Sequence, residues 1–285
     1  MRHTYKRLYT DEQVVAAFIA GANEAREYPA DELDGTVYLP ELYKSATGMS
    51  ADILCSALFG VAKGSKRKVV SGKTHLDRKY IEQTFKTTNG ASIEYRGKEL
   101  RQDDLTVLLH LISERAGMAT SCEIEFRPYT FCSAMGWSDN AKNAARLREC
   151  LLRLRQAIVI VERGGNKGGV IGFVKEFEWE RRDKWLVQLD PRIVDLFGVA
   201  PTYLSTSKRA LLAEGLQTWL YGYVKANRCG WAVPLELIHS ACGSESSNMK
   251  EFARSLREAL AKLAAIGVVH DDSTVKNGKV AIFKL

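Results

Sequence analysis

The stretch GSESSNMKEFARSLREALAKLAAIGVVHDD, Gly243–Asp272, carries the clearest structural signal in the chain. Its large apolar residues recur at the spacing of one helix face; they are Phe252, Leu256, Leu260 and Leu263. We expect a long helix at about 246–266, followed by two strands around a turn at 273–278. A short strand and short helix at 231–243 come before it, so the order is that of a winged helix-turn-helix.

The opposite face of this long helix is basic, with Lys250, Arg254 and Arg257 at helical spacing. Small polar residues that suit phosphates or base edges stand at its start: Ser246, Ser247 and Asn248. Such a stripe is also common on an ordinary solvated helix. The tight turn at Cys242–Gly243, directly before the helix, favours DNA binding by these six residues instead.

The same order of elements occurs earlier in the chain. We expect a helix at 101–117, a strand at 123–127, a short helix at 128–136, a longer helix at 138–157, and two strands around the GGNKGG turn at 164–169. Basic residues share a face of the 138–157 helix, and the turn holds a lysine. We therefore expect Lys142, Arg146, Arg153 and Lys167 to contact DNA, with Lys167 at the tip of a hairpin wing.

The predicted fold class is α+β, with tandem winged helix-turn-helix domains preceded by a mainly helical N-terminal region. That region, 1–61, has no assigned role and includes an amphipathic helix expected at 10–27 and helical pieces at 39–60. A basic linker or arm is expected at 62–90. The first winged-helix domain is expected at 91–200 and the second at 201–285.

Composition narrows the function further. Lys and Arg total 41 against 34 Asp and Glu, a net charge of +7 that favours a nucleic-acid partner without proving one. The longest apolar runs are far shorter than the roughly 20 residues of a membrane span, and the N-terminus does not read as a secretion signal. We expect a cytoplasmic protein that does not enter a membrane. The six cysteines form no CxxC pair, so we expect no structural zinc and no metal.

Motifs for enzymatic chemistry fail on inspection. The string VVSGKT at 69–74 ends like a phosphate-binding loop, but Arg67 stands where that loop needs its first glycine. No pairing of a nucleophile with a base stands out in the sequence. We expect no enzymatic activity, no catalytic residues and no cofactor.

Four blocks of the sequence resemble successive blocks of the TrfA family of plasmid replication initiators. They are SALFGVAKGSKRK, ASIEYRGKELRQDDLTVLLHLI, MGWSDNAKNAARLRECLLRL and CGSESSNMKEFARSLREAL…GVVHD, and the resemblance covers about 56–285. It implies two winged-helix domains, binding to repeated sequences (iterons) in double-stranded plasmid origin DNA, and opening of the adjacent duplex. It also implies recruitment of host DnaA and the replicative helicase, and a homodimer as an inactive store.

Three points stay open at the level of sequence. TrfA-like N-termini can carry a QLxLF-type peptide that binds the sliding clamp, and this sequence has none, which leaves the clamp as an uncertain partner. A winged-helix transcriptional repressor that binds a promoter operator would show the same single-module signals. A further alternative function is a module that binds other proteins, in which the basic residues are only part of a solvated surface.

Overall fold

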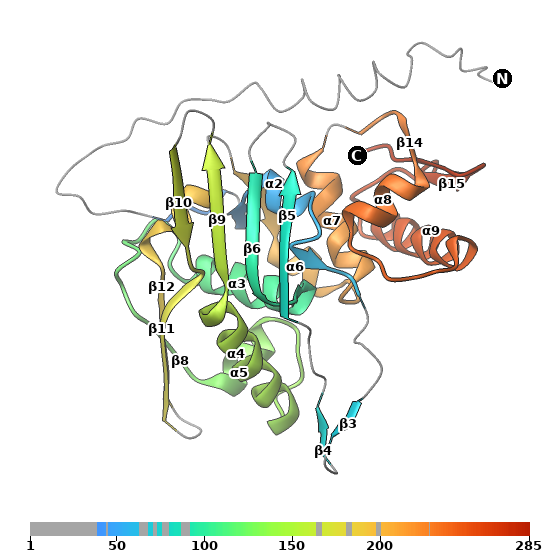
Figure 1. Ribbon diagram of the computed structural model, residues 1–285. Helices are drawn as coiled ribbons and strands as arrows, with labels where there is room; N and C mark the ends of the chain where they lie inside the picture. The colour runs from blue at the N-terminus through green and yellow to red at the C-terminus, as the bar shows by residue number, and fades with distance from the viewer. Residues whose placement is uncertain are drawn as a thin grey trace.

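The computed structural model describes residues 39–43, 45–62, 68–70, 73–75, 80–86, 92–163, 167–180, 184–197, 201–227 and 229–285. Within them the chain is a mixed α/β fold, in which helices and several small sheets share one continuous apolar core (Figure 1). The helix expected at 10–27 lies outside the described residues.

A first unit follows the order expected between 101 and 157. It comprises α3 (Gln102–Glu114), β8 (Ile124–Phe126), α4 (Pro128–Ala134), α5 (Ala141–Gln156), β11 (Val174–Glu180) and β12 (Lys184–Leu189). Pro128 opens α4, where a missing backbone N–H is tolerated. The side chain of Asn140 caps α5 by accepting a hydrogen bond from the Asn143 N–H at 2.9 Å. The helices and the strand predicted here are confirmed.

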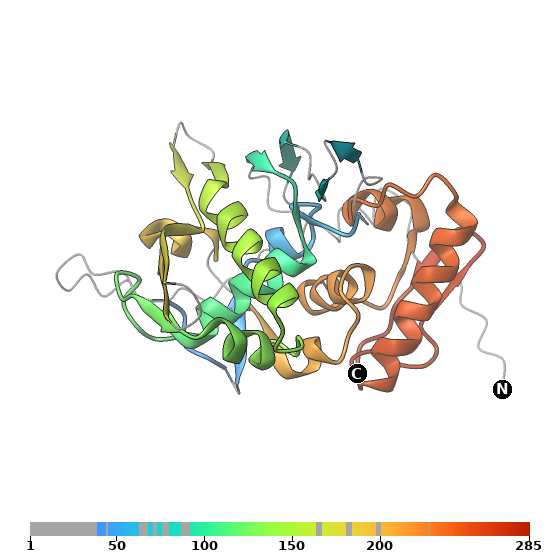
Figure 2. The same ribbon diagram turned by 90° about the horizontal axis from the view of Figure 1, so that it is seen from below.

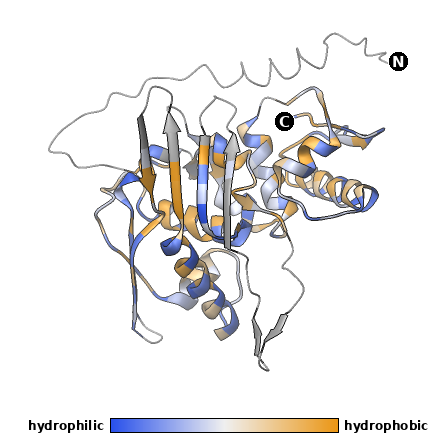
Figure 3. Cartoon of the chain, in the orientation of Figure 1, coloured by the Kyte–Doolittle hydropathy of each residue, from blue (hydrophilic) through white to orange (hydrophobic). Residues whose placement is uncertain are grey.

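A second unit repeats this order. It comprises α7 (Leu216–Ala226), β14 (Ala232–Pro234), α8 (Leu235–Ala241), α9 (Met249–Ala265), β15 (Thr274–Lys276) and β16 (Lys279–Ala281). The sheets of the two units have the strand orders β11-β12-β8 and β14-β16-β15. In each, the strand before the helix pair lies beside the last strand, so the two units share one connectivity. Figure 3 shows polar and apolar residues mixed along α5 and α9, as amphipathic helices require.

A separate four-stranded antiparallel sheet lies next to the first unit, in the order β10-β9-β6-β5. Its strands are β5 (Tyr80–Lys86), β6 (Ser92–Lys98), β9 (Ile158–Arg163) and β10 (Lys167–Ile171). The sequence pattern places the β9–β10 hairpin at the wing of the first unit, and this is wrong. Strand β9 pairs with β6, whereas β12 of the β11–β12 hairpin pairs with β8, the strand before the helix pair.

The segment 62–90, for which the sequence predicts a linker, contains strands. Strand β5 pairs with β6 along its whole length, and β3 (Lys68–Val70) pairs with β4 (Lys73–His75). The linker interpretation is therefore wrong for 80–86. Strand patterns in this segment are short and interrupted by Gly, Ser and Lys, which hides the alternation typical of a strand, although each strand pairs with a neighbouring strand along the chain.

Residues 45–62 connect both units and contain one short helix in place of the helical pieces expected. They form β1 (Ala46–Met49), the short helix α2 (Ala51–Leu54) and β2 (Phe59–Gly60). Strand β1 pairs with β13 (Thr202–Ser205), and β2 runs parallel to β7 (Leu100–Arg101). The Val61 N–H bonds to the Cys242 carbonyl at 3.0 Å. Helices α6 (Thr206–Ala210) and η1 (Pro191–Leu196, a 3-10 helix) complete the described elements.

Gly243, in the turn between α8 and α9, has a φ of +64°, and a Cβ built there would lie 3.0 Å from the Cβ of Ala57. We expect Gly243→Ala to lower the free energy of unfolding by more than about 2 kcal/mol, since the left-handed backbone alone costs an L-residue about 1–2 kcal/mol. Urea denaturation measures this loss. Gly278→Ala is the matched control, with a φ of +68° and no described atom within 4 Å of the new Cβ. Equal losses in the two variants would show that the contact with Ala57 contributes nothing.

Candidate nucleic-acid interface

Helix α9 presents the basic face that the sequence predicts. Its apolar side packs against α7 and is buried at Phe252, Leu256, Leu260 and Leu263. Lys250, Arg254 and Arg257 lie on the other side, where Arg254 and Arg257 are exposed and Lys250 is at the start of the helix. The side chain of Arg254 is 72% exposed, and its nearest carboxylate, Glu258, lies 4.0 Å away in an i,i+4 pair of little strength. Arg254 can therefore reach an anion without giving up a strong contact.

Two of the three small polar residues before α9 have structural roles. The Asn248 side-chain oxygen accepts from the N–H groups of Lys250 at 3.0 Å and Glu251 at 3.4 Å. The Ser246 hydroxyl donates to the Asn248 carbonyl at 3.2 Å, while Ser247 is exposed. A bidentate contact to adenine would need the same Asn248 oxygen. The structure therefore assigns Asn248 to capping the helix.

Two substitutions separate capping from base contact at Asn248. We expect Asn248→Ala to lower the free energy of unfolding by about 1 kcal/mol, while Asn248→Ser, which retains a capping oxygen, changes it by a few tenths. Urea denaturation and duplex titration of both variants give the two readouts. Duplex affinity should be unchanged in the serine variant. A serine variant that folds normally and binds DNA at least tenfold more weakly would restore the base-reading role.

The hairpin β15–β16 extends this basic surface. Its turn has a φ of +50° at Asn277 and +68° at Gly278, the pattern of a type I′ turn, with Lys276 opposite Lys279 across the ladder. Both lysines are exposed. The Arg257 Nε donates to the Val275 carbonyl of β15 at 3.1 Å, so Arg257 joins the hairpin to α9. Sequence reasoning missed the two lysines, although the string KNGK contains the hairpin signal.

The cations of α5 divide into three environments. Lys142 is exposed in the first turn. Arg146 is half-buried, pairs with Glu214, and places its Nε 3.4 Å from Asp103. Arg153 is 8% exposed, and its guanidinium lies 2.9 Å from Asp104 and 3.9 Å from Asp103. The prediction that Arg153 contacts DNA is wrong, because a buried and doubly paired guanidinium cannot reach a phosphate.

The hairpin predicted around Lys167 is present, but it belongs to the four-stranded sheet and not to the sheet that contains β8. Lys167 begins β10 opposite Arg163, in the four-stranded sheet. The hairpin that pairs with β8, β11–β12, exposes Glu176, Glu178 and Glu180. Arg148 of α5 lies with its guanidinium 4.3 Å from the ring centre of Trp179 on this hairpin. The first unit therefore offers less free positive charge near its helix than the second unit does.

The described residues offer little for other chemistry. One group of possible metal ligands lies together, Asp103, Asp104 and Cys150, but Arg153 already places a guanidinium against both carboxylates. A metal ion would compete with that guanidinium for the same oxygens. Burial raises the pKa of the Cys55 and Cys242 thiols to about 12 each, so neither forms a thiolate near neutral pH.

No helix in the described part of the chain has the length and apolar run that a membrane span requires.

Comparisons with known proteins agree on one family. The model of the family described as TrfA protein matches residues 37–281. Plasmid replication initiator protein TrfA from Escherichia coli is 28% identical over 193 residues, which make up 65% of this chain and 50% of that protein. The chain thus spans about half the length of this curated relative.

Two crystal structures of domains 2 and 3 of RctB are also similar. Their identities are 15% and 14%, with TM-scores of 0.48 and 0.49. Each alignment covers 73% of this chain and 92% of the other.

Proposed function

The chain belongs to the TrfA family, and we propose that it is a plasmid replication initiator that binds repeated sequences in double-stranded origin DNA. The E. coli relative is named a plasmid replication initiator protein. The observation that carries the proposal for this chain is the basic surface of the second unit. It comprises Lys250 and Arg254 on α9 and Lys276 and Lys279 on the β15–β16 hairpin; we call it the α9 surface.

The proposal includes the finer fold, two winged helix-turn-helix domains in tandem. It is supported by the shared connectivity of the two units: a helix, a strand, two helices and a hairpin whose last strand lies beside the first. In such a domain the second helix of the pair enters the major groove. Here those helices are α5 and α9, and the hairpins β11–β12 and β15–β16 are the wings.

The residues of the α9 surface would make two kinds of DNA contact, to bases and to the phosphate backbone. Lys250 and Arg254 lie on the outer side of α9, and Arg254 has the planar fork that pairs with guanine. Lys276 and Lys279 would hold the flanking phosphates, since point charges at a hairpin tip suit backbone contact. In the first unit Lys142 is the exposed cation nearest the start of α5. The second unit would then supply most of the binding energy.

The family further implies opening of the duplex beside the repeats and recruitment of host DnaA and the replicative helicase, in the cytoplasm where plasmids replicate. The proposal assigns no catalytic step, metal or cofactor to this chain. A homodimer would be the stored form, and binding of the sliding clamp is not included.

Footprinting on the origin region of the protein's own plasmid tests the proposal. We expect protection of several equal repeats next to an AT-rich tract, with an affinity that falls steeply as salt rises. Protection of a single palindrome at a promoter would overturn the initiator role. A failure to bind any duplex at low salt would overturn DNA binding altogether.

A further inference from the structure

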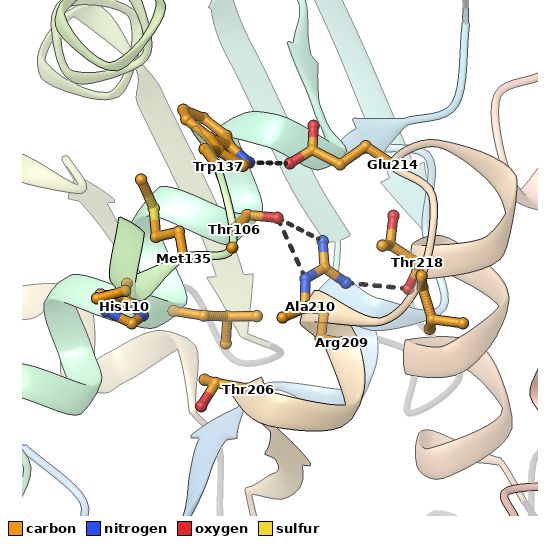
Figure 4. A pocket seen from close by; sticks show the side chains of 13 residues that line it. Thr106, His110, Met135, Trp137, Thr206, Arg209, Ala210, Glu214 and Thr218 are labelled. Atoms are coloured by element: carbon orange, nitrogen blue, oxygen red, sulfur yellow. Dashed lines mark hydrogen bonds between the residues drawn. The ribbon is translucent and has the colours of Figure 1, made fainter. Parts of the chain in front are cut away.

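A charged contact joins the helix pair of the first unit to the second unit. Glu214 stands in the turn between α6 and α7, and its carboxylate accepts from the Trp137 indole N–H at 3.0 Å (Figure 4). The same carboxylate pairs with Arg146 of α5. The Arg146 guanidinium also lies 4.1 Å from the ring centre of Trp137 and 3.4 Å from Asp103. Trp137 precedes α5, so both of its contacts fix the start of that helix.

A second contact lies close by. In it a charged guanidinium donates hydrogen bonds to uncharged groups. Arg209 of α6 is 3% exposed and donates to the Gln102 side chain at 2.9 Å. It also donates to Thr106 at 3.1 Å and to the Thr218 carbonyl at 3.0 Å (Figure 4). Burial lowers the pKa of Arg209 to about 10, which still leaves it charged near neutral pH. The guanidinium therefore bonds α3 of the first unit to α6 and α7.

These contacts resist separation. The side chains of Glu214 and Asp103 are 24% and 9% exposed, so removing Arg146 would take a cation away from two carboxylates that lie largely out of water. Burial acts to lower the pKa of Arg146, yet the carboxylates of Glu214 and Asp103 raise it overall. An incoming phosphate would have to displace partners that are already in place. The pair is thus expected to persist when DNA binds.

The contact with Glu214 connects α5 and α9, the two helices proposed to read bases. Helix α7 begins at Leu216, two residues after Glu214, and packs along α9. Figure 2 shows α7 between the helices of the first unit and α9. On α5, Lys142 lies one turn before Arg146 on the same face. Any shift at this ion pair would move Lys142 relative to the α9 surface.

We infer that Glu214 is a positioning residue that fixes α5 relative to α9 and thereby sets the base-pair spacing between the two parts of the DNA site. The inference rests on the proposed function. Glu214 need not touch DNA, and it acts through Arg146 and Trp137. It determines how strictly the protein requires one base-pair spacing between the two parts of the DNA site. Neither unit could determine this alone.

The test compares duplexes that carry one protected repeat with zero or one base pair inserted between the parts contacted by the two units. One extra base pair turns the second part by about 34–36° and moves it by about 3.4 Å. We expect the inserted base pair to weaken binding by wild-type protein about 100-fold, because one unit then no longer reaches its bases. For Glu214→Gln we expect a penalty of about tenfold or less, since the loosened junction lets both units bind.

Glu149→Gln is the matched control. It removes one carboxylate charge from α5, at a side chain that is 56% exposed and whose nearest cation is Arg148 at 3.9 Å. Its insertion penalty should equal that of wild type. Trp137→Phe keeps a ring beneath Arg146 but removes the N–H that holds Glu214, and it should relax spacing in the same direction. It also replaces Glu214→Gln if that variant does not fold.

The possible results distinguish failure of the positioning role from failure of the proposed function. An equal insertion penalty in wild type, Glu214→Gln and Trp137→Phe would overturn the positioning role and leave DNA binding intact. A wild-type protein that tolerates the insertion would also overturn it, because no fixed spacing would then exist. Failure of wild type to bind the uninterrupted repeat would overturn the proposed function itself.

Discussion

Replacing Lys250 and Arg254 together by alanine is expected to abolish specific binding at ordinary salt. Removing one base contact costs about 1–3 kcal/mol, so the double variant should bind more weakly by roughly 2–6 kcal/mol. If either residue holds a phosphate instead, the slope of log affinity against log salt should become shallower by about 0.9 for that residue. Titration of an origin repeat at several salt concentrations measures both quantities.

The fold should survive this double change. Neither side chain is part of the buried core, and the 4.0 Å pair of Arg254 with Glu258 is worth about 0.5 kcal/mol at most. Lys225→Ala with Lys262→Ala is the matched control, since both lysines are exposed in the same unit but lie away from the first turns of α9. Unchanged affinity and salt slope in the Lys250 and Arg254 variant would remove α9 from the interface.

The long helices α3, α5 and α9 could be predicted from sequence because their signals are local. In α9 the spacing of Phe252, Leu256 and Leu260 identifies the buried face, and Gly243 marks the turn before it. Strands can be predicted as reliably as helices only where the sequence also contains a clear turn signal, as between β15 and β16. Which hairpin joins the sheet of the first unit depends on the partner of β12, and that partner, β8, lies far earlier in the chain, beyond α4 and α5. No local pattern contains this information.

In the candidate site, too, local sequence patterns do not show which distant residues a side chain contacts. Helical spacing places Lys142, Arg146 and Arg153 on one side of α5, which is correct as far as the helix is concerned. Their fates differ because Asp103, Asp104 and Glu214 reach that side from α3 and from the turn before α7. A basic stripe read from sequence thus contains cations that face water and cations that neutralise buried carboxylates. Only the partners, which are 43 and 68 residues away for Arg146, distinguish them.

The predicted cations of the second unit are exposed and make few contacts with the rest of the described chain; Arg254 has only the 4.0 Å pair with Glu258. Arg257 is the exception, since it spans to the Val275 carbonyl and holds the hairpin against the helix. A residue expected to read bases thus also helps to place Lys276 and Lys279. Sequence patterns therefore locate the correct helix but not the contacts that its side chains make within the fold.

Arg153→Met is expected to be the most destabilising of the substitutions considered for α5. The guanidinium Nε and Nη2 both lie 2.9 Å from Asp104, whose side chain is fully buried, and Nη2 also lies 3.9 Å from Asp103. Methionine fills a similar volume but leaves both carboxylates without this cation. Removing one partner of a buried pair costs about 3–5 kcal/mol, and urea denaturation should show a decrease of that size.

Arg155→Met provides the matched comparison, because Arg155 is exposed two residues later on the same helix. It should change the free energy of unfolding by about 0.5 kcal/mol or less. Adding Asp104→Asn to Arg153→Met should recover part of the missing stability, since one of the buried charges is then removed. If Arg153→Met instead folds as stably as wild type and binds DNA more weakly, Arg153 contacts DNA after all. The buried pair described for α5 would then be absent from the DNA-binding form of the protein.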